Sequence, residues 1–297
     1  MNDPHGDSMG KVKIVTDSTA HFLDPSAVDR FGIAVVPLHI QFGQQDYRDG
    51  VDITTAEFFE QVGRSPVPPV ASSPTPEEFA AVYTELGKQT DRILSIHISS
   101  KLSRTYRNAR LATDTLLGRC KIHVVDSMTT SLGLGILAEA AAAAGAEDAS
   151  IDEIVRTVRG MIPRIYVVFF VETLDYLERG GRLSKSQAIL GTMLGIKPFL
   201  TIEDGDIIPM EKVRTRDKAV EKLVEFVAEF SGADTVAILH SNPQPNEDTR
   251  LLLERLAVEF PGREFPLMTY GPALACHIGP NSLGVIVYES THSLHAP

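Results

Sequence analysis

Short apolar runs alternate along this chain with segments of helical pattern, and the runs end in polar side chains. The runs and the polar segments that follow them are residues 11–16 with 17–19, 93–98 with 99–105, and 122–125 with 126–131. Strands that alternate with helices in this way predict a parallel sheet. Ligands of such sheets lie at the carboxyl ends of the strands. We therefore expect a binding site among the serine, threonine and aspartate side chains of these segments.

Local patterns place several elements in the first part of the chain. Asp24 and Pro25 predict the N-cap and first turn of a short helix that ends before Gly32. Residues 33–40 are almost continuously apolar, which predicts a buried strand. Thr75 is followed by a proline and two glutamates, a capping-box pattern that starts a helix.

The pattern changes after about residue 160. Residues 166–171 predict a strand, and Asp204-Gly205 predicts the turn of a β-hairpin among helical segments. A hairpin of this kind is typical of a mixed sheet. We expect an α/β protein of two domains, the first with a mainly parallel sheet and flanking helices, the second with a mixed sheet and helices. The expected parts are a flexible leader over residues 1–10 and domains over residues 11–160 and 161–297.

Composition excludes several classes of protein. A formal net charge of −11 argues against nucleic acid as a partner, because phosphate contacts need a basic face. The two cysteines, Cys120 and Cys276, have no CxxC spacing, so a disulfide framework is not expected. No apolar run approaches the roughly 18 residues of a membrane span, and the polar first ten residues lack the apolar core of a secretory signal. We expect a cytoplasmic protein without stable membrane insertion.

Two glycine patterns resemble nucleotide-binding motifs only loosely. Gly133 and Gly135 fit a relaxed dinucleotide fingerprint, but they do not follow a strand directly, so helix packing explains them better. The segment ending in Gly195, Lys197 and Pro198 lacks the G-K-[ST] ending of a P-loop. No motif of metal-ligand or nucleophile spacing is present in the sequence either. We expect no cofactor and no metal site.

The longest motif in the chain reads ETLDYLERGGRLSK over residues 172–185 and continues as LGTMLGIKPFL over residues 190–200. Shorter motifs precede and follow it. They are residues 14–19, 35–38, 47–53, 99–106, 204–205, 212–214 and 271–280. Together, and in this order, these segments closely resemble the pattern of the bacterial DegV family.

The resemblance implies a two-domain α/β protein with one long-chain fatty acid buried between its domains. Members of the family resemble the binding subunits of bacterial fatty acid kinase, which serve phospholipid metabolism. They present the acyl carboxylate to a separate, ATP-carrying kinase subunit that forms an acyl phosphate. By this resemblance the chain is a lipid-binding protein and not itself an enzyme.

Such a ligand needs an apolar tunnel for its tail and hydrogen-bond donors for its anionic head. Each buried methylene of the tail contributes about 0.8 kcal/mol. The residues that the resemblance assigns to the head group are Ser72, Ser99, Ser100, Ser103, Thr105, His277 and Gly279.

This chain departs from the family pattern at four positions. Ala71 stands where the family has a threonine, Ser73 where it has a glutamine, Arg104 where it has the glycine of an L-S-G-T motif, and Asn281 where it usually has a glycine. Ser103, which precedes Arg104, has two interpretations. It is either the N-cap of the following helix or a contact to an anion beside that helix.

His277 and three arginines also have two interpretations each. A histidine among apolar residues is most often a buried core residue, whereas the resemblance makes His277 a carboxylate ligand, for which an unperturbed pKa of about 6.5 is suitable. Arg179, Arg182 and Arg214 are candidate contacts to the kinase partner or its nucleotide. Alternatively, the two glycines after Arg179 simply end a helix, and Arg214 is a solvated residue beside the hairpin.

A rival hypothesis explains the same hydroxyl groups without a fatty acid. An α/β sheet whose strands end in serine and threonine is also suited to an enzyme for a small substrate, with His277 as its base. Turnover without a second protein would distinguish this enzyme from a binding protein.

Overall fold

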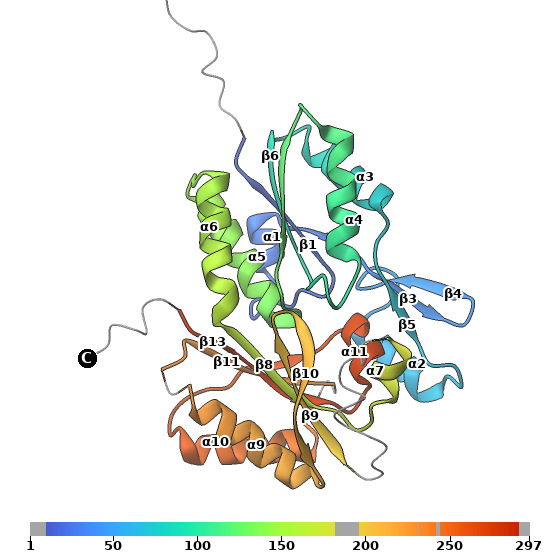
Figure 1. The fold of residues 1–297 in the computed structure, drawn as a ribbon, viewed down its shortest axis with the longest axis vertical. Coiled ribbons are helices and arrows are strands. Elements are labelled where there is room, and N and C mark those ends of the chain that lie inside the picture. Colours follow the sequence, from blue (N-terminus) through green and yellow to red (C-terminus); the bar gives the residue numbers. More distant parts are fainter. Residues whose placement is uncertain (1–9, 182–195, 231, 242–243, 291–297) are drawn as a thin grey trace, which may run out of the picture.

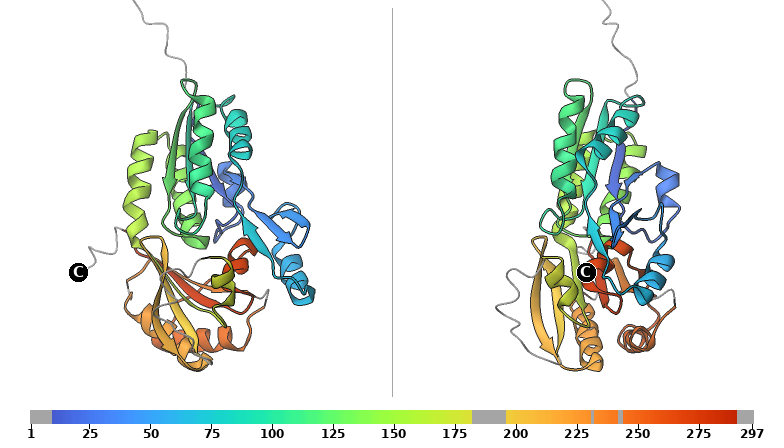
Figure 2. Two further views of the ribbon diagram at one scale, coloured as in Figure 1. Left: turned by 45° about the vertical axis from the view of Figure 1, so that its right-hand side comes forward. Right: turned by 90° about the vertical axis from the view of Figure 1, so that its right-hand side faces the viewer.

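The computed structural model describes residues 10–181, 196–230, 232–241 and 244–290. In these residues the chain is an α/β protein whose first half builds a parallel sheet and whose second half builds a mixed sheet. The two lie one above the other along the long axis, and a small third sheet projects to one side (Figure 1, Figure 2). Arg182, the leader up to residue 9 and the glycines at 191 and 195 lie outside the described residues. The division into domains at about residue 160 stays a prediction.

The parallel sheet has the strand order β2-β1-β6-β7. Its strands are β1 (Lys13–Asp17), β2 (Ala34–Val36), β6 (Arg92–His97) and β7 (Lys121–Asp126). All three pairings are parallel, so the carboxyl ends of the strands meet at one edge, as the sequence pattern predicts.

Helices cover both faces of this sheet (Figure 1). One face carries α1 (Ala27–Phe31), α5 (Ser131–Ala146) and α6 (Ile151–Met161), and the other carries α3 (Pro76–Leu86) and α4 (Thr105–Ala112). Thr75 forms the expected capping box at the start of α3, where its hydroxyl accepts the N–H of Glu78. Phe79 and Tyr83 of α3 are fully buried against the sheet.

The mixed sheet has the strand order β10-β9-β8-β13-β11-β12, and its described pairs are antiparallel except β11–β12. Its strands are β8 (Ile165–Phe170), β9 (Lys197–Glu203), β10 (Asp206–Val213), β11 (Thr235–His240), β12 (Leu267–Thr269) and β13 (Leu283–Tyr288). Asp204 (φ 49°) and Gly205 (φ 78°) both have positive φ at the turn between β9 and β10. These angles are what a two-residue D-G hairpin turn requires, which confirms the predicted hairpin.

Both faces of the mixed sheet are buried. Val168 and Phe170 of β8 pack against α9 (Arg216–Ala228) and α10 (Glu247–Glu259). Val167 and Phe169 point the other way and join a core that includes residues of the first half of the chain. This alternation along β8 means that one sheet face belongs to the junction between the two halves.

Two local predictions are wrong. Residues 33–40 are not one strand, because β2 ends before Pro37 and β3 (His39–Phe42) joins β4 (Gln45–Arg48) and β5 (Val70–Ser72) in the separate three-stranded sheet. Proline has no N–H to donate to a neighbouring strand, so no sheet hydrogen bond from Pro37 is lost when the chain leaves the parallel sheet there. Asp24 is not the N-cap of α1, because its carboxylate accepts the N–H of Ser26 and the helix begins at Ala27.

The glycines at the start of α5 allow close packing, as the sequence interpretation expects. A Cβ atom on Gly135 would lie 1.8 Å from the carbonyl oxygen of His21. One on Gly133 would lie 2.6 Å from Thr129 Oγ1 and 2.8 Å from Ile165 Cγ2. No nucleotide is needed to explain either residue.

Substituting Gly135 by Ala should therefore destabilise the protein. We expect a loss of about 1–3 kcal/mol, because the added methyl group meets backbone that has no room to move. The exposed Gly160 of α6, whose Cβ would meet no atom within 4 Å, is the matched control. Gly160→Ala should be neutral or stabilising by up to about 1 kcal/mol. Equal effects of the two substitutions in urea denaturation would contradict this packing argument.

A buried carboxyl group joins the two halves of the chain. Asp49, which follows β4, is only 5 % exposed. It accepts hydrogen bonds from the hydroxyl of Ser18 (2.9 Å) and from the backbone N–H of Ala273 in α11 (Pro272–Ile278). Burial, together with the nearby charge of Asp17, raises the pKa of Asp49 to about 7, although the two hydrogen bonds oppose this shift.

The raised pKa of Asp49 predicts a pH dependence of stability. The folded state binds the Asp49 proton more tightly than the unfolded state, so protonation of Asp49 stabilises the fold. This stabilisation is fully present below about pH 4 and is lost as the pH rises through about 7. Between pH 5 and pH 8, the wild type should lose on the order of 2 kcal/mol of unfolding free energy relative to Asp49→Asn. Parallel profiles of the two proteins in urea denaturation would show that Asp49 does not titrate in this range.

Candidate functional site

A cavity of about 380 Å³ lies at the carboxyl edge of the parallel sheet. Its walls come from the loop after β1, the end of β5, the loop between β6 and α4, the start of β10, and α11. The lining residues are Thr19, Leu38, Ala71, Ser72, Ser73, Ile98, Leu102, Ser103, Arg104, Asn108, Ile207, Ala273, Leu274 and His277. Both halves of the chain therefore contribute to one cavity.

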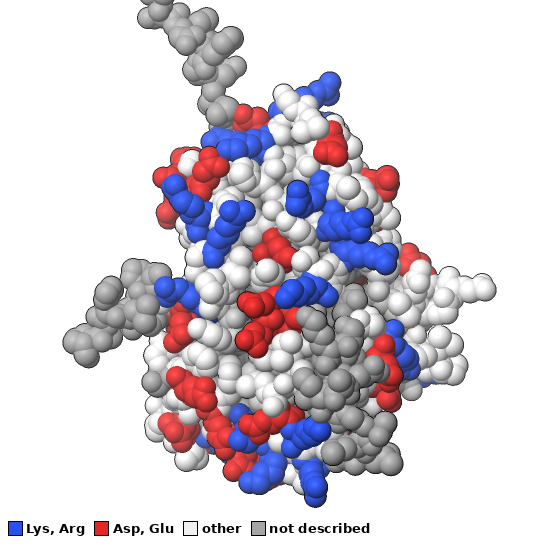
Figure 3. Space-filling model, viewed as in Figure 1, with Lys and Arg blue, Asp and Glu red and all other residues white. Residues whose placement is uncertain are grey.

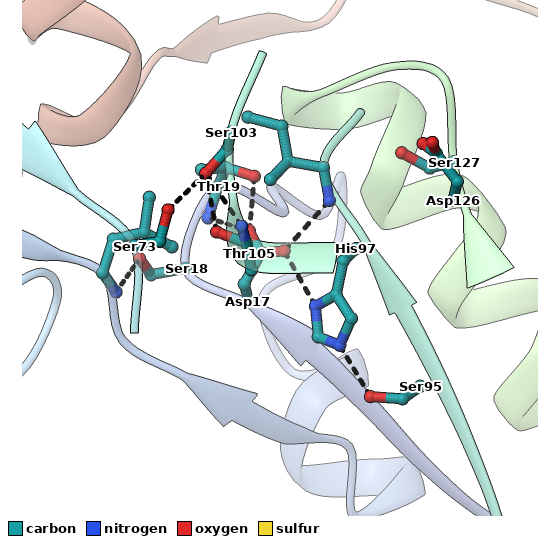
Figure 4. A network of polar contacts seen from close by, with 12 residues as sticks. Asp17, Ser18, Thr19, Ser73, Ser95, His97, Ser103, Thr105, Asp126 and Ser127 are labelled. Atoms are coloured by element: carbon teal, nitrogen blue, oxygen red, sulfur yellow. Dashed lines mark hydrogen bonds and ion pairs between the residues drawn. The ribbon is translucent and has the colours of Figure 1, made fainter. Parts of the chain in front are cut away.

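One wall of the cavity is a chain of hydroxyl groups (Figure 4). The oxygen of Ser103 lies 2.9 Å from that of Ser73 and 2.7 Å from that of Thr105. Ser103 also accepts the backbone N–H of Thr105 at 3.2 Å, although Arg104 occupies the N-cap position of α4. Ser103 thus orders the start of the helix and faces the cavity at the same time.

Three of the residues expected at the head group line this cavity together. Ser72, at the end of β5, and Ser103 come from the first half of the chain, and His277 comes from α11 in the second half. Thr105 is fully buried behind Ser103 and supports it through their hydroxyl contact.

The structure places Ser99 and Ser100 away from the lining of the cavity. The hydroxyl of Ser99 donates to the carbonyl oxygen of Gly205 at 2.6 Å, which ties the loop after β6 to the β9–β10 turn. Ser100 is exposed, and its N–H donates to the carboxylate of Asp126. The loop turns back on itself here, since the N–H of Ser103 donates to the carbonyl oxygen of Ser99.

Gly279 shapes the wall that carries His277 rather than lining the cavity. It ends α11 with a φ of 81°, and a Cβ atom there would lie 2.9 Å from the ring of Tyr176. Its carbonyl oxygen accepts the hydroxyl of Tyr270 at 2.8 Å, and that hydroxyl accepts the N–H of Ser282. Burial raises the pKa of Tyr270 to about 12, so the phenol stays a donor at any physiological pH.

The glycine pair after α7 (Asp175–Arg179) packs directly on His277. A Cβ atom on Gly180 would lie 2.6 Å from the Nδ1 atom of the His277 ring. Gly181, with a φ of 66°, then takes the left-handed conformation common after helix ends. The glycines thus end the helix, as the simpler interpretation expects, and also let its end approach the imidazole.

The arginines considered as partner contacts lie at the surface of the described chain. Arg179 stacks on the ring of Tyr176 at 4.7 Å, and its Nε donates to the carbonyl oxygen of Asp175. Arg214 is exposed just after β10. Neither lines the cavity.

A buried polar network, which the sequence interpretation missed, lies behind the cavity (Figure 4). The hydroxyl of Tyr83 donates to Ser95 (2.8 Å), whose oxygen lies 2.6 Å from Nε2 of His97. Nδ1 of His97 lies 3.0 Å from the carboxylate of Asp17. The only hint in the sequence is the spacing of Ser95 and His97, which puts two polar side chains on one face of an apolar strand.

This network has the groups of a Ser-His-Asp triad but not the access that a triad needs. Ser95, His97 and Asp17 are all 0 % exposed, and the Ser95 oxygen is already bonded to Tyr83. A nucleophile must reach its substrate, so these residues are not positioned to attack one.

The network instead fixes a residue of the cavity wall. Asp17 accepts both the N–H (3.1 Å) and the hydroxyl (2.6 Å) of Thr19, which lines the cavity. With its hydrogen committed to Asp17, the Thr19 hydroxyl presents only lone pairs to the cavity. Thr19 belongs to a strand-end segment in which a binding site was expected, whereas Ser73 and Asn108 were not recognised as cavity residues from the sequence.

A second, apolar space of about 30 Å³ adjoins the polar cavity. Leu102, Ile207 and Leu274 line both. The other residues around the apolar space come mainly from the inner face of the mixed sheet and from α11. They are Thr130, Val167, Phe169, Ile202, Leu239, Tyr270, Ile278, Ser282, Leu283 and Gly284.

The described residues contain no group of three or more His, Cys, Asp or Glu side chains that is placed to hold a metal ion. None of the helices within these residues has the length and apolar character to cross a membrane.

Comparison with known proteins gives one consistent result. Residues 11–290 match the family model described as "Uncharacterised protein, DegV family". A DegV domain-containing protein of Caldanaerobacter subterraneus subsp. tengcongensis is 36 % identical over 287 residues, which cover 95 % of this chain and 100 % of the relative.

Solved structures agree with the sequence match. Bacillus subtilis DegV, described as a fatty acid binding protein, is 32 % identical with a TM-score of 0.84, covering 95 % of this chain and 100 % of that one. A DegV family protein from Thermus thermophilus, whose structure is described in terms of fatty acid binding, is 34 % identical with a TM-score of 0.81, covering 94 % and 100 %. In sequence and in fold, this chain belongs to the DegV family.

Proposed function

We propose that this protein binds one long-chain fatty acid, with the carboxylate in the polar cavity and the tail in the apolar space beside it. The observation that carries this proposal is the shared lining of the two spaces by Leu102, Ile207 and Leu274. A molecule with one charged end and one apolar end fits that pairing. The description of the Bacillus subtilis and Thermus thermophilus structures by fatty acid binding supports it.

The polar cavity supplies what a carboxylate needs. Ser72 and Ser103 line it from the first half of the chain, and His277 lines it from the second half. A buried anion without donors costs several kcal/mol, and hydrogen bonds to charged groups contribute about 1.5–3 kcal/mol each. Thr19 is not a donor in this scheme, because its hydrogen is bonded to Asp17.

The tail would lie between the parallel and mixed sheets, between the domains expected over residues 11–160 and 161–297. Burial of a long tail offers roughly 10 kcal/mol or more before the costs of association. The apolar space of about 30 Å³ is much smaller than such a tail. Side chains on the inner face of the mixed sheet therefore move apart when the ligand enters.

The bound carboxylate is then a substrate for another protein. We propose that this chain presents it to a separate, ATP-carrying kinase subunit, which forms the acyl phosphate for phospholipid metabolism in the cytoplasm. Arg179, Arg182 and Arg214 are the proposed contacts to that subunit. In this role the chain is a binding subunit and not an enzyme.

Protein purified from bacteria should carry a fatty acid. Native mass spectrometry should give a mass increment of one fatty acid, and solvent extraction should release it for identification. Protein that is empty and takes up neither palmitate nor oleate would contradict the proposal. Turnover of a small substrate by the chain alone, abolished in a folded His277→Ala variant, would favour the rival enzyme hypothesis.

Removing head-group donors should weaken palmitate binding. Ser103→Ala and His277→Ala should each cost about 1–3 kcal/mol of binding free energy in calorimetry on delipidated protein, since each removes a hydrogen bond to a charged group. Ser100→Ala is the matched control, because Ser100 faces solvent. Unchanged affinity in both Ser103→Ala and His277→Ala would remove these residues from the site.

A further inference from the structure

The polar cavity carries a positive charge that a fatty acid carboxylate does not require. Arg104 is the one Arg or Lys among the described residues that line it. Arg104 follows Ser103 directly in the chain, and it is exposed, whereas Ser103 is partly buried. His277 and the hydroxyl groups already provide for a single carboxylate.

No acidic side chain neutralises this arginine in the described part of the chain. Arg104 at the N-cap of α4 and Arg107 and Arg110 within the helix are exposed and spaced three residues apart, so successive arginines are neighbours on its surface. Arg110 lies over the ring of Tyr106, and none of the three forms an ion pair with a described residue. Figure 3 shows Lys and Arg side chains gathered over α4, on a protein whose formal net charge is −11.

We propose that Arg104 is the residue of this cavity that binds the phosphoryl group of the acyl phosphate. This inference rests on the proposed function. In the transfer, a carboxylate oxygen bonds to the γ-phosphorus of ATP, the bond from that phosphorus to the β,γ-bridging oxygen breaks, and ADP leaves with the electron pair. The new group therefore extends beyond the carboxylate, and Arg104 is the exposed cationic residue of the described lining that is available to meet it.

A guanidinium group suits the charge of the acyl phosphate better than it suits the charge of the fatty acid. A phosphoryl group carries about −1.5 to −2 charges near neutral pH, whereas a carboxylate carries a single one. Arginine offers two parallel N–H donors to phosphate oxygens, and its charge does not depend on pH in the physiological range.

The test compares two ligands on the full-length, delipidated chain by calorimetry. One is palmitate. The other is the palmitoyl phosphate analogue in which a methylene group replaces the oxygen between the carbonyl carbon and phosphorus, which prevents hydrolysis. The quantity of interest is the ratio of the two affinities, analogue over palmitate. In Arg104→Gln this ratio should fall about 10-fold, as expected for loss of a partly exposed charged hydrogen bond.

Two further variants distinguish a specific contact between Arg104 and the phosphoryl group from a general effect of positive charge. Arg104→Lys keeps the charge without the paired donors and should restore part of the ratio. Arg107→Gln, the same charge change one helical turn away and outside the cavity lining, should leave the ratio unchanged. An unchanged ratio in Arg104→Gln, or an equal fall in Arg107→Gln, would overturn the inference. A wild-type chain that binds neither ligand would instead contradict the proposed function itself.

Discussion

The carboxylate of Asp17 is the point on which the geometry of the site depends. It is completely buried at the end of β1 and accepts hydrogen bonds from the N–H and hydroxyl of Thr19, from the N–H of Ile98 and from the ring of His97. A buried carboxylate is tolerated only when its oxygens are saturated in this way. The ends of β1 and β6 are therefore held together, and the loop that carries Ser103 starts from a fixed position.

The second half of the chain completes the site through a small number of contacts with the first half. Ser99 bonds to the β9–β10 turn at Gly205, and Asp49 bonds to the start of α11. These contacts set the face of the mixed sheet that carries Val167 and Phe169 against the first half of the chain. A polar cavity and an apolar space lie next to each other as a result, which is the arrangement that an amphiphilic ligand needs.

The sequence predicts those features whose cause is local. The D-G hairpin and the capping box at Thr75 follow from turn chemistry within a few residues, and the parallel sheet follows from the alternation of strand and helix patterns along residues 11–131; all three are present. The split of residues 33–40 was missed because an apolar run does not reveal that Pro37 moves the chain from one sheet to another. The buried network was missed because Asp17 and His97 are 80 residues apart and meet only through strand pairing.

The residues of the candidate site were also predictable only in part. The family motifs led to Ser72, Ser103 and His277, which line one cavity, but also to Ser99 and Ser100, whose orientation depends on a turn that sequence spacing does not specify.

The most direct measurement is a crystal structure of this protein grown with palmitate. We expect the carboxylate within about 3.2 Å of Ser103 Oγ and of the His277 ring, with the tail running past Leu102 along the inner face of the mixed sheet. Palmitate bound elsewhere, or lying with its carboxylate among the residues of the apolar space, would contradict it.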